Sequence, residues 1–190
     1  MEDKIAAALE QHRAAAAALA ADHSAIAPIA RLITKTVLAG GKVLVCGNGG
    51  SASDSQHIAG ELVGRFKKER RAIAAVALTA DTSVLTCLGN DYGFDSVFER
   101  QVEALGREGD LLIAISTSGS SPNVLKAAAK AKALGMSVVG FFGQKEGAIL
   151  PHCDLAFRAP SPDTPRVQEM HILAAHIICG LVEDAVSAAS

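Results

Sequence analysis

The chain contains no tryptophan and a single tyrosine, Tyr92, among its 190 residues. Stacking of aromatic side chains on a ligand is therefore not expected as a means of recognition. Its four cysteines, Cys46, Cys87, Cys153 and Cys179, are scattered and form no CxxC pair. This spacing indicates neither a disulfide framework nor a zinc-finger site, and we expect reduced, partly buried thiols.

An excess of positive charge is also missing. The chain has 18 Lys+Arg and 20 Asp+Glu, a formal net charge of -2, so it lacks the broad positive field that nucleic-acid binding requires. The longest basic run, Lys67, Lys68, Arg70 and Arg71, is interrupted by Glu69. We interpret this run as a solvated connection after a helix, and we expect no nucleic-acid partner.

No window of the sequence approaches the uninterrupted apolar stretch that a membrane span requires, and the acidic start Met1, Glu2, Asp3 does not resemble a secretion signal. We therefore expect a cytoplasmic protein with no membrane partner. With 190 residues, 49% of them hydrophobic, the chain can bury the core of one ordinary domain but is short for two. The sequence predicts a single domain over residues 1–190.

Two helices are predicted at the start of the chain, over 3–21 and about 24–38, because these segments are rich in strong helix formers. Together they form an N-terminal helical extension over residues 1–39. The alanine run 14–18 is interpreted as a helix surface that packs closely against a neighbour, in this chain or in another subunit.

From Lys42 onward, short aliphatic runs alternate with longer helical segments. Continuous apolar runs of this length are typical of strands covered on both faces. Regular alternation of strand and helix predicts an α/β fold, with an open parallel sheet between layers of helices. The predicted strands are 43–46, 73–78, 111–115, 137–142 and 155–157, and the predicted helices are 52–66, 93–105, 121–134 and 165–188. Ligands bind such sheets beyond the carboxyl ends of the strands.

A glycine-rich loop, residues 47–51, follows the first predicted strand. Its three glycines allow the backbone to turn sharply and to approach a ligand, and Ser51 or Ser53 can cap the following helix. The loop matches neither the GxGxxG dinucleotide fingerprint nor the GK[ST] ending of a P-loop. On the residues alone, a plain structural turn and a ligand-binding loop remain open.

Five hydroxyl side chains surround a glycine at the end of the third predicted strand. These are Ser116, Thr117, Ser118, Ser120 and Ser121. Hydroxyls, backbone N–H groups and the positive end of a helix meet there, which favours an anion such as a phosphate monoester. A helix cap is the alternative, but a cap needs only one hydroxyl. The pattern therefore favours phosphate binding.

Two further segments carry groups that can bind metal or transfer protons. His57 and Glu61 are four residues apart, which places them one turn apart on one helix face, although a lone pair of this kind is more often a surface contact. His176 lies in the last predicted helix among apolar neighbours. A core histidine satisfied by a local hydrogen bond is the alternative interpretation of this residue.

Taken together, these segments resemble the sugar isomerase (SIS) domain, and more closely its phosphoheptose isomerases. The resemblance covers nearly the whole chain. It depends on five motifs in order: Gly47-Asn-Gly-Gly-Ser51, His57-x-x-x-Glu61, Gly89-Asn-Asp91, Ser116-Thr-Ser-Gly-x-Ser121 and Gln168-Glu-x-His-x-x-x-x-His176.

The resemblance implies a three-layer α/β/α sandwich with a five-stranded parallel sheet, preceded by N-terminal helices. It implies a homotetramer with sites between subunits. The implied activity converts sedoheptulose 7-phosphate, a phosphorylated seven-carbon sugar, to D-glycero-D-manno-heptose 7-phosphate through an enediol. Such products enter lipopolysaccharide cores or related nucleotide-activated heptoses.

The resemblance also implies roles for individual residues. Phosphate would be held by Ser116, Thr117, Ser118 and Ser121. The rest of the substrate would contact Asn48, Gly49, Gly50, Ser51, Glu61, Asn90, Asp91 and Gln168. One Zn²⁺ per subunit would be bound by His57, Glu61, Gln168 and His176. The acid/base pair would be Glu61 and His176.

Two of these implied roles conflict with simple chemistry. A carboxylate or imidazole that already donates its lone pair to zinc cannot freely accept a proton. Gln168 and His176 are eight residues apart, about 12 Å along an ideal helix, and glutamine is a poor zinc ligand. A shared ion would need the long reach of the Gln168 side chain, a break in the helix, or ligands from different subunits.

Three alternatives within the same fold remain open. One is a non-catalytic SIS scaffold that binds the replication initiator, and the presence of both Glu61 and His176 favours an enzyme over it. A second is a sugar-phosphate sensor, but sensors of this type usually carry a DNA-binding module that 190 residues do not accommodate. The third is an isomerase of another phosphosugar, which fold analogy does not exclude.

Overall fold

A parallel sheet of five strands, in the order β2-β1-β3-β4-β5, forms the centre of the protein. The structure is a computed structural model that describes residues 1–145 and 147–189. The strands are β1 Val43–Gly47, β2 Ala75–Ala77, β3 Leu111–Ser116, β4 Ser137–Phe142 and β5 Leu155–Arg158. Every neighbouring pair runs parallel. The predicted α/β fold with a five-stranded parallel sheet is confirmed.

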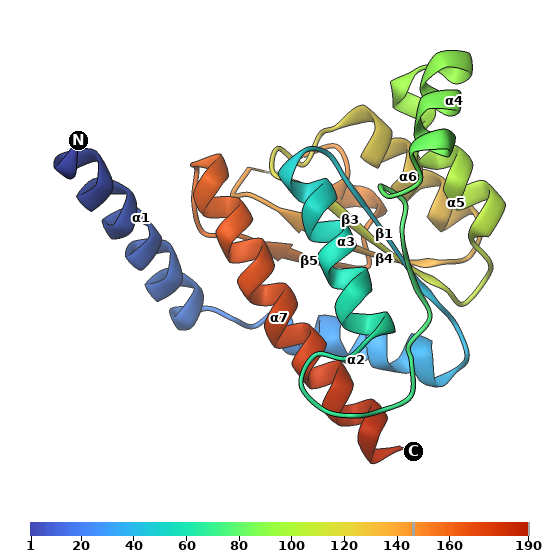
Figure 1. The fold of residues 1–190 in the computed structure, drawn as a ribbon, viewed down its shortest axis with the longest axis horizontal. Helices are drawn as coiled ribbons and strands as arrows, with labels where there is room; N and C mark the ends of the chain where they lie inside the picture. The colour runs from blue at the N-terminus through green and yellow to red at the C-terminus, as the bar shows by residue number, and fades with distance from the viewer. Residues whose placement is uncertain (146, 190) are drawn as a thin grey trace.

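Helices cover both faces of this sheet (Figure 1). They are α1 Glu2–Ala21, α2 Ile26–Leu38, α3 Gly50–Val63, α4 Thr82–Tyr92, α5 Glu99–Leu105, α6 Pro122–Ala133 and α7 Thr164–Ala188, with short 3-10 turns η1 Phe94–Ser96 and η2 Leu150–His152. Helix α1 projects from the body and buries only Ala15 and Leu19.

Strand alternation divides the core into two layers. In β1, Val43 and Val45 pack with α2, α3 and α7, whereas Leu44 and Cys46 pack with α5 and α6 on the other face. Strand β3 divides in the same way. Because both faces are buried, the strands are apolar throughout, which is the pattern that made them recognisable in the sequence.

The segment between β2 and β3 differs from the sequence prediction. Helix 93–105 was expected, but α4 occupies residues before it and the predicted segment is divided between η1 and α5. Gly93, with a φ of +79°, ends α4, and the side chain of Asp81 caps its start by accepting from the N–H of Val84. None of the residues of α4 is fully buried, and its short apolar stripe packs only partly against the core through Leu85 and Leu88, so the helical signal was weak.

Helix α7 meets the length and hydropathy expected of a membrane-spanning helix, with a mean hydropathy of 1.4 over an 18-residue window. The expectation that no window approaches such a stretch was therefore wrong for α7. The bent pair α1 and α2 also passes when taken as one span. Half of the α7 window is buried inside the protein, and its packing against α2 and α3 accounts for its apolar composition.

A histidine of α7 lies in the core. His171 is 1% exposed, its Nε2 lies 3.0 Å from the carbonyl oxygen of Phe142, and its ring contacts Phe141 and Phe157 edge-on. Burial lowers the pKa of His171 to about 4, although the bond to Phe142 opposes this shift. The core histidine that the sequence analysis considered at position 176 is therefore found at position 171.

The buried imidazole predicts a loss of stability in mild acid. The unfolded chain binds a proton at His171 below pH 6.5, whereas the folded protein resists it until about pH 4. The free energy of unfolding should therefore fall between pH 6.5 and 4 by up to roughly 3 kcal/mol from this group. Urea titrations at several pH values, compared with His171→Gln, measure this contribution. A stability difference between the two proteins that does not change with pH would contradict the prediction.

Candidate active site

The glycine loop lies at the carboxyl end of β1, as the fold requires for a ligand site. Gly49 has a φ of +56°, a conformation that side-chain-bearing residues rarely adopt. The side-chain amides of Asn48 and Asn123 bond reciprocally, at 2.9 and 2.8 Å. This pair fixes the loop to the start of α6, and Asn123, which the sequence analysis missed, is 2% exposed.

The hydroxyls after β3 gather into one cluster, which we call the hydroxyl cradle (Ser116, Thr117, Ser118 and Ser121). The Oγ of Ser116 lies 2.9 Å from that of Ser121 and 3.3 Å from that of Ser118. Ser121 is the N-cap residue of α6, yet its side chain makes no capping bond to that helix. The capping alternative therefore does not account for the cluster, and the positive end of α6 stays available to an anion.

A cavity of about 240 Å³ opens beside the cradle, between the ends of β3 and β4 and the start of α7. Thr117 and Ser118 line it on one side, and Ser161 and Thr164 line it on the other. A larger hollow of about 530 Å³ lies between β2, α4 and α5. That hollow is mostly apolar and contains none of the predicted site residues, so we assign the ligand site to the smaller, polar cavity.

Gln168 belongs to the cradle end of the site. A Cβ added at Gly50 would collide with the side-chain amide of Gln168, so the absence of a side chain at Gly50 makes room for that amide. Helix α7 is continuous from Thr164 to Ala188, which leaves no break to bring Gln168 and His176 together within one protomer. Of the three routes to a shared metal ion, the break in the helix is therefore excluded.

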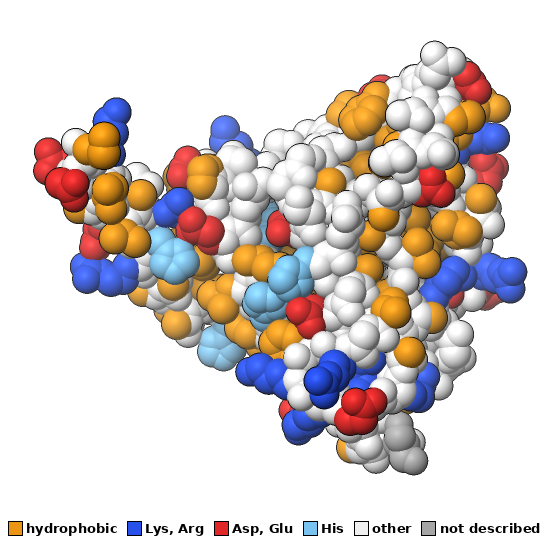
Figure 2. Space-filling model, in the orientation of Figure 1, with side chains coloured by type: hydrophobic (Ala, Val, Ile, Leu, Met, Phe, Trp, Pro, Cys, Tyr) orange, Lys and Arg blue, Asp and Glu red, His pale blue; other side chains and the backbone are white. Residues whose placement is uncertain are grey.

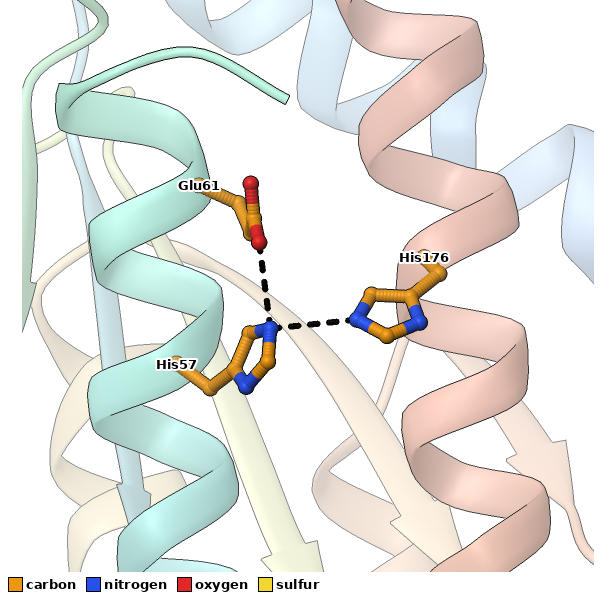
Figure 3. A group of neighbouring side chains, drawn as sticks. All are labelled: His57, Glu61 and His176. Carbon is orange, nitrogen blue, oxygen red and sulfur yellow. Dashed lines mark hydrogen bonds and ion pairs between the residues drawn. The ribbon is translucent and has the colours of Figure 1, made fainter. Parts of the chain in front are cut away.

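A second group of side chains lies further along the same two helices. His57 and Glu61 come from α3 and His176 comes from α7, and the three side chains converge (Figure 3). The Nε2 of His57 is 3.1 Å from Oε1 of Glu61 and 3.1 Å from Nε2 of His176. We call these residues the histidine–glutamate group. His57 and Glu61 are therefore more than a surface pair on one helix, because His176 of α7 contacts His57 as well.

The donor atoms of the group fit a metal ion. All three lie within 4.8 Å of one another, and ligands 2.0–2.1 Å from a tetrahedral Zn²⁺ would be about 3.3 Å apart. Two imidazole nitrogens and a carboxylate oxygen face one point, and a cation there can accept all three lone pairs at once. Two histidines and a glutamate are also a known ligand set of catalytic zinc.

The surroundings leave this group open to solvent on one side. The side chains of His57 and Glu61 are 46% and 22% exposed, and histidine side chains are visible beside an acidic one on the face where α3 and α7 meet (Figure 2).

Burial raises the pKa of the nearby Cys179 to about 12, and the charge of Glu61 adds to this effect. Cys179 is therefore a protonated thiol, not a metal-binding thiolate.

Two predicted substrate residues lie apart from these groups in the protomer. Asn90 and Asp91 are exposed at the end of α4, where the Asn90 amide donates to Asp91 at 2.7 Å. Among the contacts of the described residues, none joins them to the cradle or to the histidine–glutamate group. Ser51 is 3% exposed at the start of α3 and lies next to the loop.

Comparison with known proteins identifies the family of this chain. A sequence model of the SIS domain matches residues 8–143. A phosphoheptose isomerase of Rhodospirillum rubrum is 56% identical over 161 residues, which is 85% of this chain and 86% of the relative. One from Bradyrhizobium sp. is 52% identical over 187 residues, or 97% of this chain and 94% of the relative. The chain belongs to the phosphoheptose isomerases of the SIS-domain family.

Solved structures of phosphoheptose isomerases have the same fold. The enzyme from Neisseria gonorrhoeae superimposes with a TM-score of 0.91 at 41% identity, covering 96% of this chain and 98% of that one. The enzyme from Francisella tularensis gives a TM-score of 0.92 at 39% identity, covering 96% and 97%. The resemblance inferred from the five motifs is confirmed at the level of family and fold.

The contact between Gly50 and Gln168 yields a mutational test. Gly50→Ala should displace the Gln168 amide without unfolding α3, because the clashing atoms belong to the end of a flexible side chain. Phosphoheptose isomerase activity, measured as kcat/KM, should fall about 10-fold, equivalent to about 1.4 kcal/mol. Gln168→Ala should have a similar effect, and the double variant should be no worse than either one.

Gly60→Ala is the matched control for this test. Gly60 lies in the same helix, but nothing occupies the space around its added Cβ, so activity should be unchanged and stability slightly raised. Additive losses in the double variant would show that Gly50 and Gln168 act separately.

Proposed function

We propose that the protein interconverts sedoheptulose 7-phosphate and D-glycero-D-manno-heptose 7-phosphate through an enediol, in the cytoplasm and on the route to lipopolysaccharide heptose. The observation that carries this proposal is the convergence of Glu61 and His176, from two separate helices, on one solvent-facing point. The hydroxyl cradle supports a substrate that ends in a phosphate monoester.

The reaction moves a proton between C1 and C2, so it needs a base at carbon and a proton donor at oxygen. Oε1 of Glu61 faces His57, while its second oxygen points away from that ring (Figure 3). The second oxygen is free to take the C1 proton of the ketose and return it to C2. His176 is placed to take the proton of one substrate oxygen and to give one to the other.

The histidine–glutamate group would hold Zn²⁺ through His57, Glu61 and His176. When bound, the ion would act as a Lewis acid that polarises the oxygens on C1 and C2. Glu61 would use one carboxylate oxygen for the ion and the other for the substrate, so its two proposed roles are compatible. His176 presents only Nε2 to the group, so it would transfer protons when Nε2 does not bind the ion and would act as a ligand when it does.

The hydroxyl cradle and the histidine–glutamate group lie near opposite ends of α3. Gly50, at the cradle end, and Glu61 are eleven positions apart, about 16 Å along the helix. We infer that each complete site combines the cradle and Gln168 of one subunit with the histidine–glutamate group of another, in a homotetramer. Exposed apolar residues support such assembly. They are Ile5 and Leu9 on α1 and Leu173, Ile177 and Leu181 at four-residue spacing on α7.

Removal of the base tests the proposed reaction. Glu61→Gln keeps the shape of the side chain but cannot accept the carbon-bound proton, so turnover of sedoheptulose 7-phosphate should fall at least about 1,000-fold. In deuterated water, the wild-type product should carry deuterium at C2. A wild-type protein that does not turn over this substrate, or a Glu61→Gln variant that keeps full activity, would refute the proposal.

Mixed oligomers test whether the site is shared. Ser118→Asp places a negative charge in the cradle, and Glu61→Gln disables the other end, so each variant alone should be inactive. Co-expressed in equal amounts, the two should recover roughly a quarter of wild-type activity, because random pairing restores about one site in four. Glu61→Gln with His176→Gln is the control, and it should recover nothing because both changes lie in the same group. No recovery in the first pair would place the whole site within one subunit.

A further inference from the structure

The connection between α3 and β2, residues 64–74, has no regular secondary structure, and we call it the strap. It contains the basic run that the sequence analysis interpreted as solvated. The prediction of a connection is confirmed, but that interpretation is wrong for Arg70, whose side chain is 1% exposed. A buried guanidinium must find partners inside the protein.

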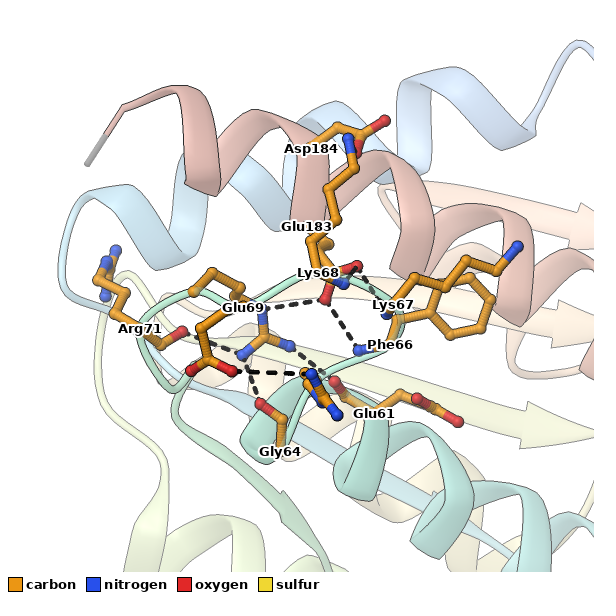
Figure 4. Close-up of polar contacts among 11 residues, drawn as sticks. Glu61, Gly64, Phe66, Lys67, Lys68, Glu69, Arg71, Glu183 and Asp184 are labelled. Atoms are coloured by element: carbon orange, nitrogen blue, oxygen red, sulfur yellow. Dashed lines mark hydrogen bonds and ion pairs between the residues drawn. The ribbon is translucent and has the colours of Figure 1, made fainter.

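The partner of the strap is a carboxylate on α7. Glu183 is 2% exposed, and its two oxygens accept the backbone N–H groups of Phe66, Lys67 and Lys68, each at 2.8 Å (Figure 4). Its Oε1 also lies 3.6 Å from Nε of Arg70. One side chain of α7 thus satisfies three consecutive backbone donors that have no helix or sheet to bond to.

Arg70 extends this contact to the end of α3. Its guanidinium donates to the carbonyl oxygen of Glu61 at 2.7 Å and to that of Gly64 at 3.0 Å. The last carbonyls of a helix have no partner within the helix, so Arg70 supplies what the C-terminus of α3 lacks. Because Glu61 lies in this last turn, the position of its backbone depends on Arg70, and Arg70 in turn faces Glu183.

Phe66 brings the same strap to the other member of the acid/base pair. Its ring centroid is 5.6 Å from that of His176, with the planes tilted by 30°. The ring also packs near Gly180, where an added Cβ would be 3.4 Å from it. The hydrogen bond from the backbone N–H of Phe66 to Glu183 therefore holds Phe66 in place, and the ring of Phe66 borders the His176 imidazole.

We propose that Glu183 is a positioning residue that, through the strap, sets the separation of Glu61 and His176. Glu183 follows His176 by seven residues, two turns of α7, and touches neither the substrate cavity nor the histidine–glutamate group. It acts on Glu61 through Arg70 and on His176 through Phe66. The inference rests on the proposed isomerase function for its kinetic readout.

The charge of Glu183 is maintained by its surroundings. Burial raises the pKa of this carboxyl, but the three backbone N–H groups and Arg70 outweigh burial and hold the pKa below its ordinary value. The carboxylate is therefore ionised at neutral pH. Bonds from N–H groups to a charged acceptor are about twice as strong as neutral ones, so a neutral isostere is a substantial change.

Glu183→Gln tests the role of that charge, with Asp184→Asn as the matched control. Asp184 is the next residue of the same helix and also faces the strap, through Lys68 at 2.8 Å, but both of these side chains are about 60% exposed. Glu183→Gln should lower kcat for sedoheptulose 7-phosphate about 10- to 100-fold with KM within about threefold, because the cradle is untouched. Asp184→Asn should match the wild type.

Two further measurements separate positioning from loss of fold. Backbone amide exchange over 64–71 should accelerate in Glu183→Gln at a temperature where circular dichroism shows a folded protein, and Zn²⁺ affinity should weaken about 10-fold. Glu183→Asp, which keeps the charge on a shorter stem, should fold and recover part of kcat. If Glu183→Gln does not fold, the same measurements are made on Glu183→Asp.

The outcomes distinguish this inference from the proposed function. Wild-type kcat in a folded Glu183→Gln protein with accelerated exchange would overturn the inference, as would a loss of kcat that only follows the unfolded fraction. A wild-type protein without turnover would refute the proposed function instead. In that case, the Zn²⁺ affinities of the variants test the role of Glu183. Equal Zn²⁺ affinity in Glu183→Gln and Asp184→Asn would overturn its positioning role.

Discussion

The parallel packing of α3 against α7 on one face of the sheet is the constraint on which the site depends (Figure 1). Because the two helices run in the same direction, Gly50 meets Gln168 at one end and His57 meets His176 about two turns later. Helices that crossed steeply would bring together one of these pairs and not the other. The register of two helices thus determines which residues can share a ligand.

The same packing separates the proposed phosphate site from the proposed acid/base pair. The cradle depends mainly on local features, namely the end of β3 and the start of α6, and the long-range Asn48–Asn123 pair joins it to the glycine loop. The histidine–glutamate group depends on contact between distant segments. In the proposed assembly, the cradle of one subunit meets the histidine–glutamate group of another without a change in either. A single protomer would have to bend α7 to bring its own two groups together. A continuous, well-packed helix resists such bending, because a kink needs a proline or an inserted group.

These differences explain what the sequence could predict. The strands and the cradle are encoded within a few residues of one another, so their apolar runs and clustered hydroxyls were readable. Helix α4 buries none of its residues fully and gave only a short periodic signal. The burial of Arg70 and the pairing of Asn123 depend on contacts across the fold. A charge run or a single amide has the same composition whether exposed or buried, so the sequence could not distinguish the two cases.

Glu183 illustrates how tertiary contact changes the meaning of a residue. In the sequence it is one acidic position in an apolar helix, and α7 has the hydropathy of a membrane span. In the fold it is the partner of an irregular strap, and without it three backbone donors would lose their acceptor and the Arg70 guanidinium would lose the charge that it faces. Burying this carboxylate is costly, and an exposed acid could help anchor the strap without that cost, as Asp184 does. Its burial is best explained by a need to hold the end of α3 in one position, the requirement that Glu61 would impose as the proposed base.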